Sequence, residues 1–372
     1  MAKAKTIDPA PQAATTATGR LAGKIALVTG AAGNLGGYIV RHYLAEGATV
    51  VMTGRTEARL EAAAEAMRAA SGVDATRLAT VILDGGNPQS VRDAVADVVR
   101  RFGRIDILVN NAGSAGPKQP IEQLPFDDEE LAALQKRGST DTETVPAAMR
   151  NIFGVAWNLA RTVAAAMPEG GSIINVSTIF SRTPYYARAA YVVPKAAMNA
   201  WSRELSLELG PRGIRVNLVF PGPIESERIR TVFAAMDTMR GDDQGTTAQT
   251  FFDMMSLERS TGGAAKAKTF PVPDDIATTC VFLGSDESAA YNGHDFEVTH
   301  GMTVRKEERS TYIARPTMRS MDGAGLAILI VAGENWEEAL EIARIQIKCG
   351  TSVLLGVPRQ ADVAIAQARA KA

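Results

Sequence analysis

Short apolar runs alternate with amphipathic stretches along most of the chain. The runs are rich in valine and isoleucine and are followed at once by glycine, proline or polar residues, which is typical of buried strands. We expect strands at residues 24–29, 49–53, 80–83, 105–109, 172–176 and 215–220, and a last one at 294–298.

Between these runs, alanine-rich stretches and apolar residues at helical spacing predict helices. They lie at residues 35–46, 57–70, 88–102, 189–209 and 274–283. Strands that alternate with helices in this way predict an α/β fold, a Rossmann-type doubly wound parallel sheet. Two longer connections, 116–144 and 225–273, are expected to be functional lids or disordered, because long structureless insertions are uncommon in a compact domain.

A charged stretch at 305–309 interrupts the pattern and is most simply a solvated linker. Beyond it, apolar runs at 326–331 and 352–357 predict two strands with a helix at 336–348 between them. We expect this to be the opening of a second α/β unit that stops before completion, so that the chain is either a fragment or has its remainder packed on the first domain. The predicted organisation is a disordered tail at 1–20, a main domain at 21–303, a linker at 304–322 and an incomplete second Rossmann-like unit at 323–372.

Composition narrows the function classes. Hydrophobic residues make up 46% of the 372 residues and the net charge is −1, so nothing points to nucleic acid or an anionic membrane as a partner. No apolar run is long enough to span a bilayer and no signal peptide is apparent, which predicts a cytoplasmic protein. Two distant cysteines (Cys280 and Cys349) and three histidines give little support to a metal site or a Ser-His-Asp triad.

A glycine-rich turn follows the first strand. Gly30, Gly33 and Gly36 precede the first helix, where bare backbone and a helix N-terminus favour a pyrophosphate. A purely structural turn is the alternative. Arg55 follows the second strand, at the position where an acidic residue would select NAD. Its guanidinium can pair with a 2′-phosphate, which favours NADPH. The alternative is that Arg55 is only a solvated surface arginine. Asp84 could accept a hydrogen bond from the adenine amino group, or only serve a turn.

Tyr191 and Lys195 lie four residues apart, about one helical turn, so both side chains project from one face. A lysine ammonium there favours the ionised phenol and would lower its pKa from the usual value of about 10. Such a tyrosine can give a proton to a carbonyl oxygen or take one from an alcohol. By itself this spacing is weak evidence, since it arises often on solvated helix faces.

In order and spacing, these motifs resemble the short-chain dehydrogenase/reductase family over about 21–303. The resemblance implies that Tyr191 protonates the carbonyl, Lys195 assists it, Thr178 polarises the carbonyl and Asn151 orders a water beside Lys195. Asn151 as a helix cap and Thr178 as a strand-end hydroxyl are the alternatives. The implied cofactor-binding residues are Gly30, Gly33, Asn34, Leu35, Gly36, Arg55, Asp84, Gly85, Asn111, Ala112, Gly113, Tyr191, Lys195, Pro221, Gly222 and Ile224.

Two positions depart from the commonest family pattern. Asn34 replaces the middle glycine of the turn, which asparagine can do because it tolerates a left-handed backbone. Thr178 stands where a serine is usual, with Ser177 and Ser181 as alternatives, and its hydroxyl can make the same hydrogen bond.

A closer resemblance is to the N-terminal reductase part of bifunctional malonyl-CoA reductases, carried by stretches such as 110–116, 175–182 and 221–233. It implies that the chain reduces malonate semialdehyde to 3-hydroxypropionate with NADPH, and that it is part of a longer bifunctional chain. The alternatives are a generic 3-oxoacyl or ketone reductase and a non-catalytic NADP-binding module.

A substrate with a carboxylate calls for a cation near the site. The expected substrate-binding residues are Arg182, Arg188, Ser114 and Arg228, with Arg182 and Arg188 favoured because the loop from Thr178 to Tyr191 must pass close to the substrate. The helix that carries Tyr191 has an apolar face. Such helices commonly form dimer interfaces in this family, so the resemblance implies a homodimer; a face buried in the core of the domain is the alternative.

Overall fold

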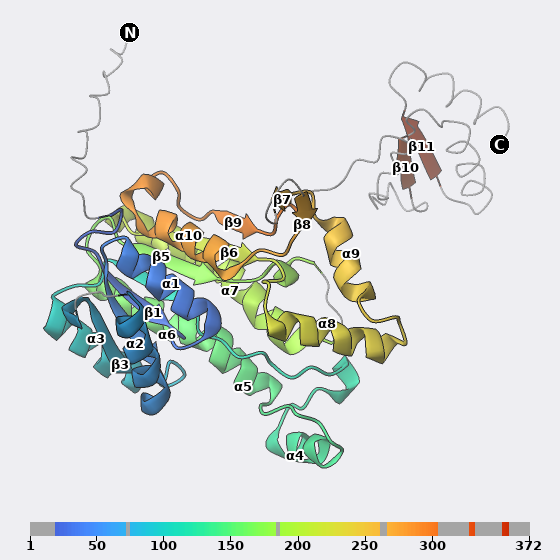
Figure 1. The fold of residues 1–372 in the computed structure, drawn as a ribbon, viewed down its shortest axis with the longest axis horizontal. Helices are drawn as coiled ribbons and strands as arrows, with labels where there is room; N and C mark the ends of the chain where they lie inside the picture. Colours follow the sequence, from blue (N-terminus) through green and yellow to red (C-terminus); the bar gives the residue numbers. More distant parts are fainter. Residues whose placement is uncertain are drawn as a thin grey trace, which may run out of the picture. The chain divides into compact units, whose positions relative to one another are not determined.

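A computed structural model describes residues 19–71, 75–183, 187–260, 266–303, 327–331 and 352–356 (Figure 1). The chain divides into two units, 1–303 and 304–372. Almost all of the expected N-terminal tail, the whole expected linker and the helix expected at 336–348 lie outside the described residues.

The first unit is built on one seven-stranded sheet in the order β3-β2-β1-β4-β5-β6-β9. Every neighbouring pair is parallel, so the chain must cross over the sheet between strands. The expected doubly wound Rossmann-type sheet is therefore confirmed. Its strands are β1 (Ile25–Thr29), β2 (Thr49–Gly54), β3 (Leu78–Ile82), β4 (Ile107–Asn110), β5 (Ser172–Val176), β6 (Arg215–Pro221) and β9 (Asp295–Val298).

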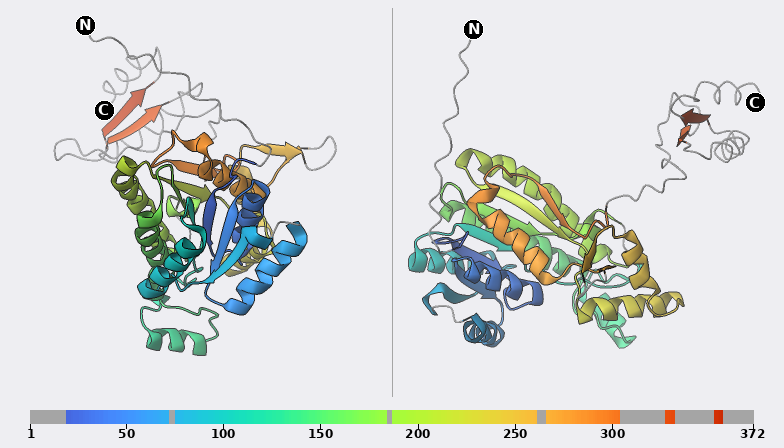
Figure 2. Two further views of the ribbon diagram at one scale, coloured as in Figure 1. Left: turned by 90° about the vertical axis from the view of Figure 1, so that its left-hand side faces the viewer. Right: turned by 45° about the horizontal axis from the view of Figure 1, so that its top comes forward.

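Three helices cover each face of the sheet (Figure 2). The first core holds residues of α1 (Asn34–Ala45), α2 (Glu57–Ser71) and α10 (Pro273–Gly284), among them the fully buried Tyr43. The second core holds residues of α3 (Pro88–Phe102), α6 (Val155–Val163) and α7 (Ala189–Leu209). With apolar side chains on both faces, the strands read as continuous apolar runs.

Local sequence sets the ends of α3. The Asn87 side chain accepts hydrogen bonds from the backbone N–H groups of Gln89 and Ser90, and Pro88 occupies the first turn, where its missing N–H costs nothing. Gly103 ends the helix at φ +83°, a backbone conformation that glycine adopts without strain.

Both long connections contain helices. The first carries α4 (Asp128–Lys136) and leads into α5 (Val145–Met149), a π-helical turn (Arg150–Gly154) and α6. The second carries α8 (Glu227–Arg240), α9 (Thr246–Met254) and the antiparallel pair β7 (Glu258–Ser260) and β8 (Lys266–Lys268). The aromatic rings of Phe233 and Phe251, stacked 4.9 Å apart, join α8 to α9 in a third apolar cluster.

In the second unit, β10 (Ala327–Val331) and β11 (Ser352–Gly356) pair in parallel. These two strands lie within the apolar runs at 326–331 and 352–357 from which strands were expected. Among the described residues, no helix has the length and apolar character needed to cross a membrane.

Candidate active site

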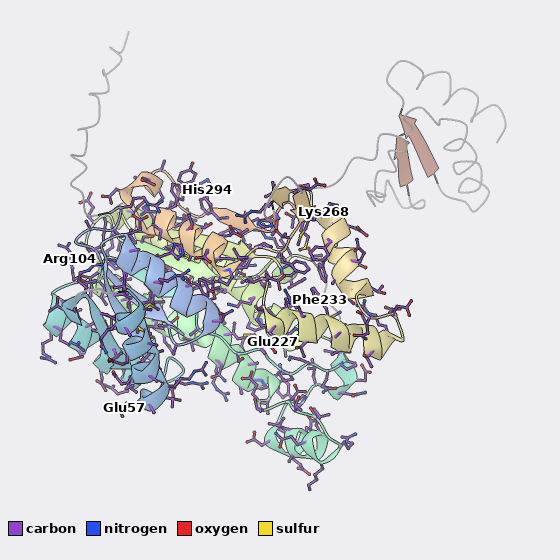
Figure 3. All side chains as sticks on the ribbon, in the orientation of Figure 1. Glu57, Arg104, Glu227, Phe233, Lys268 and His294 are labelled. Atoms are coloured by element: carbon purple, nitrogen blue, oxygen red, sulfur yellow. The ribbon has the colours of Figure 1, made fainter. Side chains whose placement is uncertain are left out.

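The strand order of the sheet reverses between β1 and β4, and a cavity of about 640 Å³ lies there, at the carboxyl ends of the strands. This switch point is where open α/β sheets bind ligands. In Figure 3, Arg104 and His294, which precede β4 and β9, mark the opposite end of the sheet, and Phe233 marks α8 on the cavity side. Ser226, Ile229 and Val232, at and after the start of α8, line the cavity.

The glycine turn forms one wall of the cavity. Gly30 has φ +63°, and a Cβ on Gly36 would overlap the Gly30 carbonyl oxygen, so neither position accepts another residue without a shift. Gly33, the N-cap residue of α1, has no side chain that could cap the helix, which leaves backbone N–H groups for an anion. Asn34 is the first residue of α1 and has no positive φ, so the left-handed backbone we allowed for at this position is not needed.

Thr29 fastens the ends of β1 and β4 to each other, a role that sequence analysis missed. Its hydroxyl donates to the Val109 carbonyl at 3.1 Å and accepts from the N–H groups of Asn111 and Ala112 at 3.0 and 2.9 Å. Asn111 in turn donates to the Thr29 carbonyl at 3.0 Å. The threonine that precedes the glycine turn was a visible signal for this contact.

Two arginines line the cavity beyond the end of β2. Arg55 and Arg59 are both exposed, and Arg59 was not anticipated. Glu57, the first acid after β2, is not among the lining residues, so the side chains here fit a phosphate better than a bare ribose. Asp84 also lines the cavity, while its Oδ1 accepts from Gly86 N–H at 3.1 Å, so it makes a turn as well.

The four catalytic candidates, Asn151, Thr178, Tyr191 and Lys195, all line this same cavity. Helix α7 carries Tyr191 and Lys195, as the spacing predicted. Lys195 is only 4% exposed, and its Nζ donates to the Val176 carbonyl at 2.6 Å. Burial lowers the pKa of Lys195 to about 8, because the charged form loses hydration.

Hydrogen bonding separates Thr178 from the neighbouring serines. The Ser177 hydroxyl donates to Asn199 Oδ1 at 2.5 Å, and the Ser181 hydroxyl donates to the Thr178 carbonyl at 2.6 Å and does not line the cavity. The Thr178 hydroxyl accepts from Phe180 N–H at 3.4 Å, and among the described residues it donates to none. Within the described residues, Thr178 is therefore the one of the three hydroxyls whose proton is left for a ligand.

Asn151 lies in the π-helical turn, a rare geometry that is frequent at functional sites. Its Nδ2 donates to Glu143 Oε2 at 2.9 Å. Sequence analysis did not find Glu143, because it lies in the 116–144 insertion and no motif marks it.

Some of the expected substrate-binding residues line the cavity and one does not. Arg188 lines the cavity with its guanidinium 5.0 Å from the centre of the Tyr191 ring, and Ser114 also lines it, with a buried hydroxyl that no described residue hydrogen-bonds. The structure does not bring Arg182 to the cavity: its side chain pairs with Asp295 and Glu297 and stacks on Phe220, and it is not among the lining residues. The guanidinium of Arg182 is held by the carboxylates of Asp295 and Glu297 on β9, which keeps it out of the cavity lining.

Two more basic residues remain. The backbone of Arg228 belongs to α8, but its side chain lies outside the described part of the structure. Lys118 lines the cavity and was not anticipated.

The residues present fit a nicotinamide dinucleotide. A bare glycine turn, the helix N-terminus that follows it and two arginines meet the needs of its phosphates. The Ser114 hydroxyl, which no described residue hydrogen-bonds, offers a further polar contact. The remaining cofactor residues expected from sequence all line the cavity, namely Leu35, Gly85, Asn111, Ala112, Gly113, Pro221, Gly222 and Ile224. Among the described residues, no cluster of His, Cys, Asp or Glu could hold a metal ion.

Known proteins match this chain over most of its length. The family of short chain dehydrogenases matches residues 24–237. Glucose and ribitol dehydrogenase of Daucus carota is 31% identical, over 80% of this chain and 92% of the relative. An uncharacterized oxidoreductase of Methylorubrum extorquens is 33% identical, over 76% of this chain and 99% of the relative.

A solved structure is more similar still. The crystal structure of the N-domain, with NADP, of a bacterial malonyl-CoA reductase is 79% identical, with a TM-score of 0.75 and 95% of this chain covered. This chain spans 65% of the length of that one. Together with the four catalytic candidates around one cavity, these matches establish that the chain belongs to the short-chain dehydrogenase family.

Proposed function

We propose that this chain reduces malonate semialdehyde to 3-hydroxypropionate with NADPH, as the N-terminal part of a bifunctional malonyl-CoA reductase. The observation that carries the proposal is the meeting of Tyr191, Lys195, Thr178 and Arg188 around one cavity with the glycine turn. The 79% identity to a malonyl-CoA reductase N-domain with NADP supports the choice of substrate and cofactor. Arg55 and Arg59 support NADPH over NADH, since guanidinium groups pair well with phosphate.

The bound nicotinamide supplies the hydride. The Tyr191 phenol donates its proton to the carbonyl oxygen, and the Thr178 hydroxyl donates a hydrogen bond to the same oxygen as negative charge develops there. Lys195, with its pKa lowered to about 8, gives up a proton more readily than an exposed lysine and so can return one to the tyrosinate. The product alcohol thus gains one hydride and one proton.

A cation next to the proton donor suits an aldehyde that carries a carboxylate. Arg188 is the first residue we assign to that carboxylate, because it lines the cavity and lies against the Tyr191 ring. A charge-assisted hydrogen bond of this kind is worth about 1.5–3 kcal/mol, which corresponds to a ten- to hundredfold preference for the acid.

The decisive experiment measures NADPH consumption by the purified chain with malonate semialdehyde, beside NADH and beside propanal, which lacks the carboxylate. We expect turnover with NADPH that Tyr191→Phe lowers by a factor of about 10² or more. Arg188→Ala should reduce kcat/KM for malonate semialdehyde about tenfold or more and barely change it for propanal. NADPH binding without turnover of the semialdehyde would overturn the substrate assignment, and turnover that survives Tyr191→Phe would overturn the mechanism.

We further propose that the chain forms a homodimer through the outer face of α6 and α7. Val193, Trp157 and Leu207 are 54%, 43% and 72% exposed there, and Trp157 lies against Trp201 at 5.5 Å between ring centres. Large apolar side chains that share an exposed face are costly in water and favour association. Sedimentation should give a dimer that Leu207→Glu dissociates; a wild-type monomer would overturn this assignment.

A further inference from the structure

The Glu143 carboxylate bridges two segments of the active site. Its Oε2 accepts from Asn151 Nδ2 at 2.9 Å, and its Oε1 accepts from the backbone N–H of Gly116 at 3.2 Å. The next residue, Thr144, caps α5, and its hydroxyl accepts from Ala147 N–H at 3.3 Å. The Glu143 side chain is half-buried, and both of its carboxylate oxygens accept hydrogen bonds. The backbone that follows it is fixed by the Thr144 cap.

The bond to Asn151 decides which way its amide faces. A primary amide has a donor end and an acceptor end, and an ionised carboxylate can only accept. Asn151 must therefore turn its NH₂ group toward Glu143, which leaves its carbonyl oxygen on the other side. Without such a partner, the two orientations of an asparagine amide differ little in shape.

The second bond fixes Glu143 independently of Asn151. Gly116 has φ +63°, and a Cβ there would lie 3.0 Å from the Ala190 carbonyl carbon and 3.1 Å from the Tyr191 nitrogen. The Gly116 backbone is thus packed against the start of α7, beside the proposed proton donor. The hydrogen bond from Gly116 fixes the position of the Glu143 carboxylate, and the carboxylate in turn fixes the orientation of the Asn151 amide.

We propose that Glu143 is a positioning residue for reduction. It holds the Asn151 amide with Oδ1 offered to the cavity that Lys195 also lines, where Oδ1 can accept a hydrogen bond from the ammonium or from a water that serves it. The effect on catalysis rests on the proposed function, whereas the orientation of the amide does not.

Glu143→Gln tests the proposal with little change of shape. A glutamine offers one acceptor and one donor, so it cannot accept both hydrogen bonds and it lets the Asn151 amide turn round. We expect kcat to fall about tenfold while KM for NADPH and for the aldehyde stay within about twofold. Glu129→Gln, an equal charge change at an exposed position of α4 in the same insertion, is the matched control and should leave both constants unchanged.

A double-mutant cycle shows whether Glu143 acts through Asn151. In an Asn151→Ala background, with Asn151→Ser as a second background should the first fold poorly, Glu143→Gln should lower kcat by less than about twofold. The same tenfold loss in both backgrounds would mean that Glu143 has only a general structural role, and the proposal would fall.

A readout without substrate separates this inference from the proposed function. The side-chain NH₂ resonances of Asn151, assigned by their loss in Asn151→Ser, should shift in Glu143→Gln and remain in place in Glu129→Gln. Unshifted resonances in Glu143→Gln would overturn the inference. Should the wild type fail to reduce malonate semialdehyde, the proposed function falls while this signal still decides the role of Glu143.

Discussion

Lys195 is a buried cation whose hydrogen-bond partner is a neutral backbone carbonyl, that of Val176. Its pKa is about 8 in the folded protein and about 10.5 in an unfolded chain, so between these values the unfolded state binds more protons. Stability contributed by this group therefore rises with pH from about 8 to about 10.5, and below pH 8 the buried charge opposes folding.

Lys195→Met should remove this pH dependence. The shift corresponds to about 3 kcal/mol at most, so we expect the variant to unfold at higher urea concentration than the wild type near pH 7 and to lose that advantage by pH 10.5. Urea unfolding of the cofactor-free wild type and variant, from about pH 7 to about pH 10.5, measures the free energy of unfolding at each pH. Equal pH slopes for the two proteins would contradict the expectation.

Arg55 and Arg59 set cofactor choice in our proposal. Replacing either by alanine should raise KM for NADPH about tenfold and leave KM for NADH almost unchanged, because only NADPH carries the 2′-phosphate. Steady-state kinetics with both cofactors measures the effect. Arg92→Ala, at an exposed position of α3 outside the cavity lining, is the control, and equal effects on both cofactors would count against the assignment.

Sequence reasoning found residues that belong to ordered motifs, and it missed those whose role depends on distant partners. Tyr191 and Lys195 are neighbours on one helix, so their spacing alone brought them together. Arg182 was assigned to the substrate because its loop passes the site, but its partners Asp295 and Glu297 follow more than a hundred positions later. Glu143 and Lys118 belong to an insertion whose path no periodicity reveals.

At the scale of elements, Arg215 ties β6 to the end of α10. It is buried and donates to the Leu283 and Ser285 carbonyls at 3.1 and 3.3 Å and to the Ser288 hydroxyl at 2.8 Å. Burial lowers the pKa of Arg215, but its positive charge suits the carbonyl groups that a helix leaves free at its C-terminus.

Arg215→Ala should lower the free energy of unfolding by about 3 kcal/mol, since it leaves buried carbonyl groups without their charged donor. Guanidinium unfolding measures the loss, and kcat of the folded variant should be unchanged because Arg215 does not line the cavity. Arg212→Ala, which removes one bond from an exposed arginine to the Ala164 carbonyl, should cost less than about 1 kcal/mol. Equal losses in the two variants would refute this reading.

The elements best predicted from sequence are those with a strong period or a cap. Helix α3 and strand β5 match their expected bounds, because α3 begins at a capped proline and ends at a glycine, and β5 is a fully buried run. Helices α4, α8 and α9 were not predicted individually. They lie in insertions that pack on only part of the domain, so their apolar positions are too few to give a clear period.

At the scale of the whole molecule, all seven strands of the large sheet and every described residue that lines the cavity lie before Thr303. A chain that ends at Thr303 should therefore fold, bind NADPH with unchanged affinity and unfold within about 2 °C of the full chain. Calorimetry measures the unfolding temperature, and a fluorescence titration measures the affinity for NADPH. Loss of cooperative unfolding would show that residues 304–372 are needed for the first unit.

The cavity wall draws on segments from Thr29 at the end of β1 to Val232 in α8, so no half of the domain holds the dinucleotide alone. Partial opening of the sheet destroys the site as thoroughly as complete unfolding does. Binding of the dinucleotide therefore stabilises the whole domain. Free ligand at a hundred times its Kd raises the free energy of unfolding by about 2.7 kcal/mol. Loss of reduced and oxidised cofactor alike would leave the domain open to proteolysis, so its survival in a cell would follow the supply of the nucleotide that it consumes.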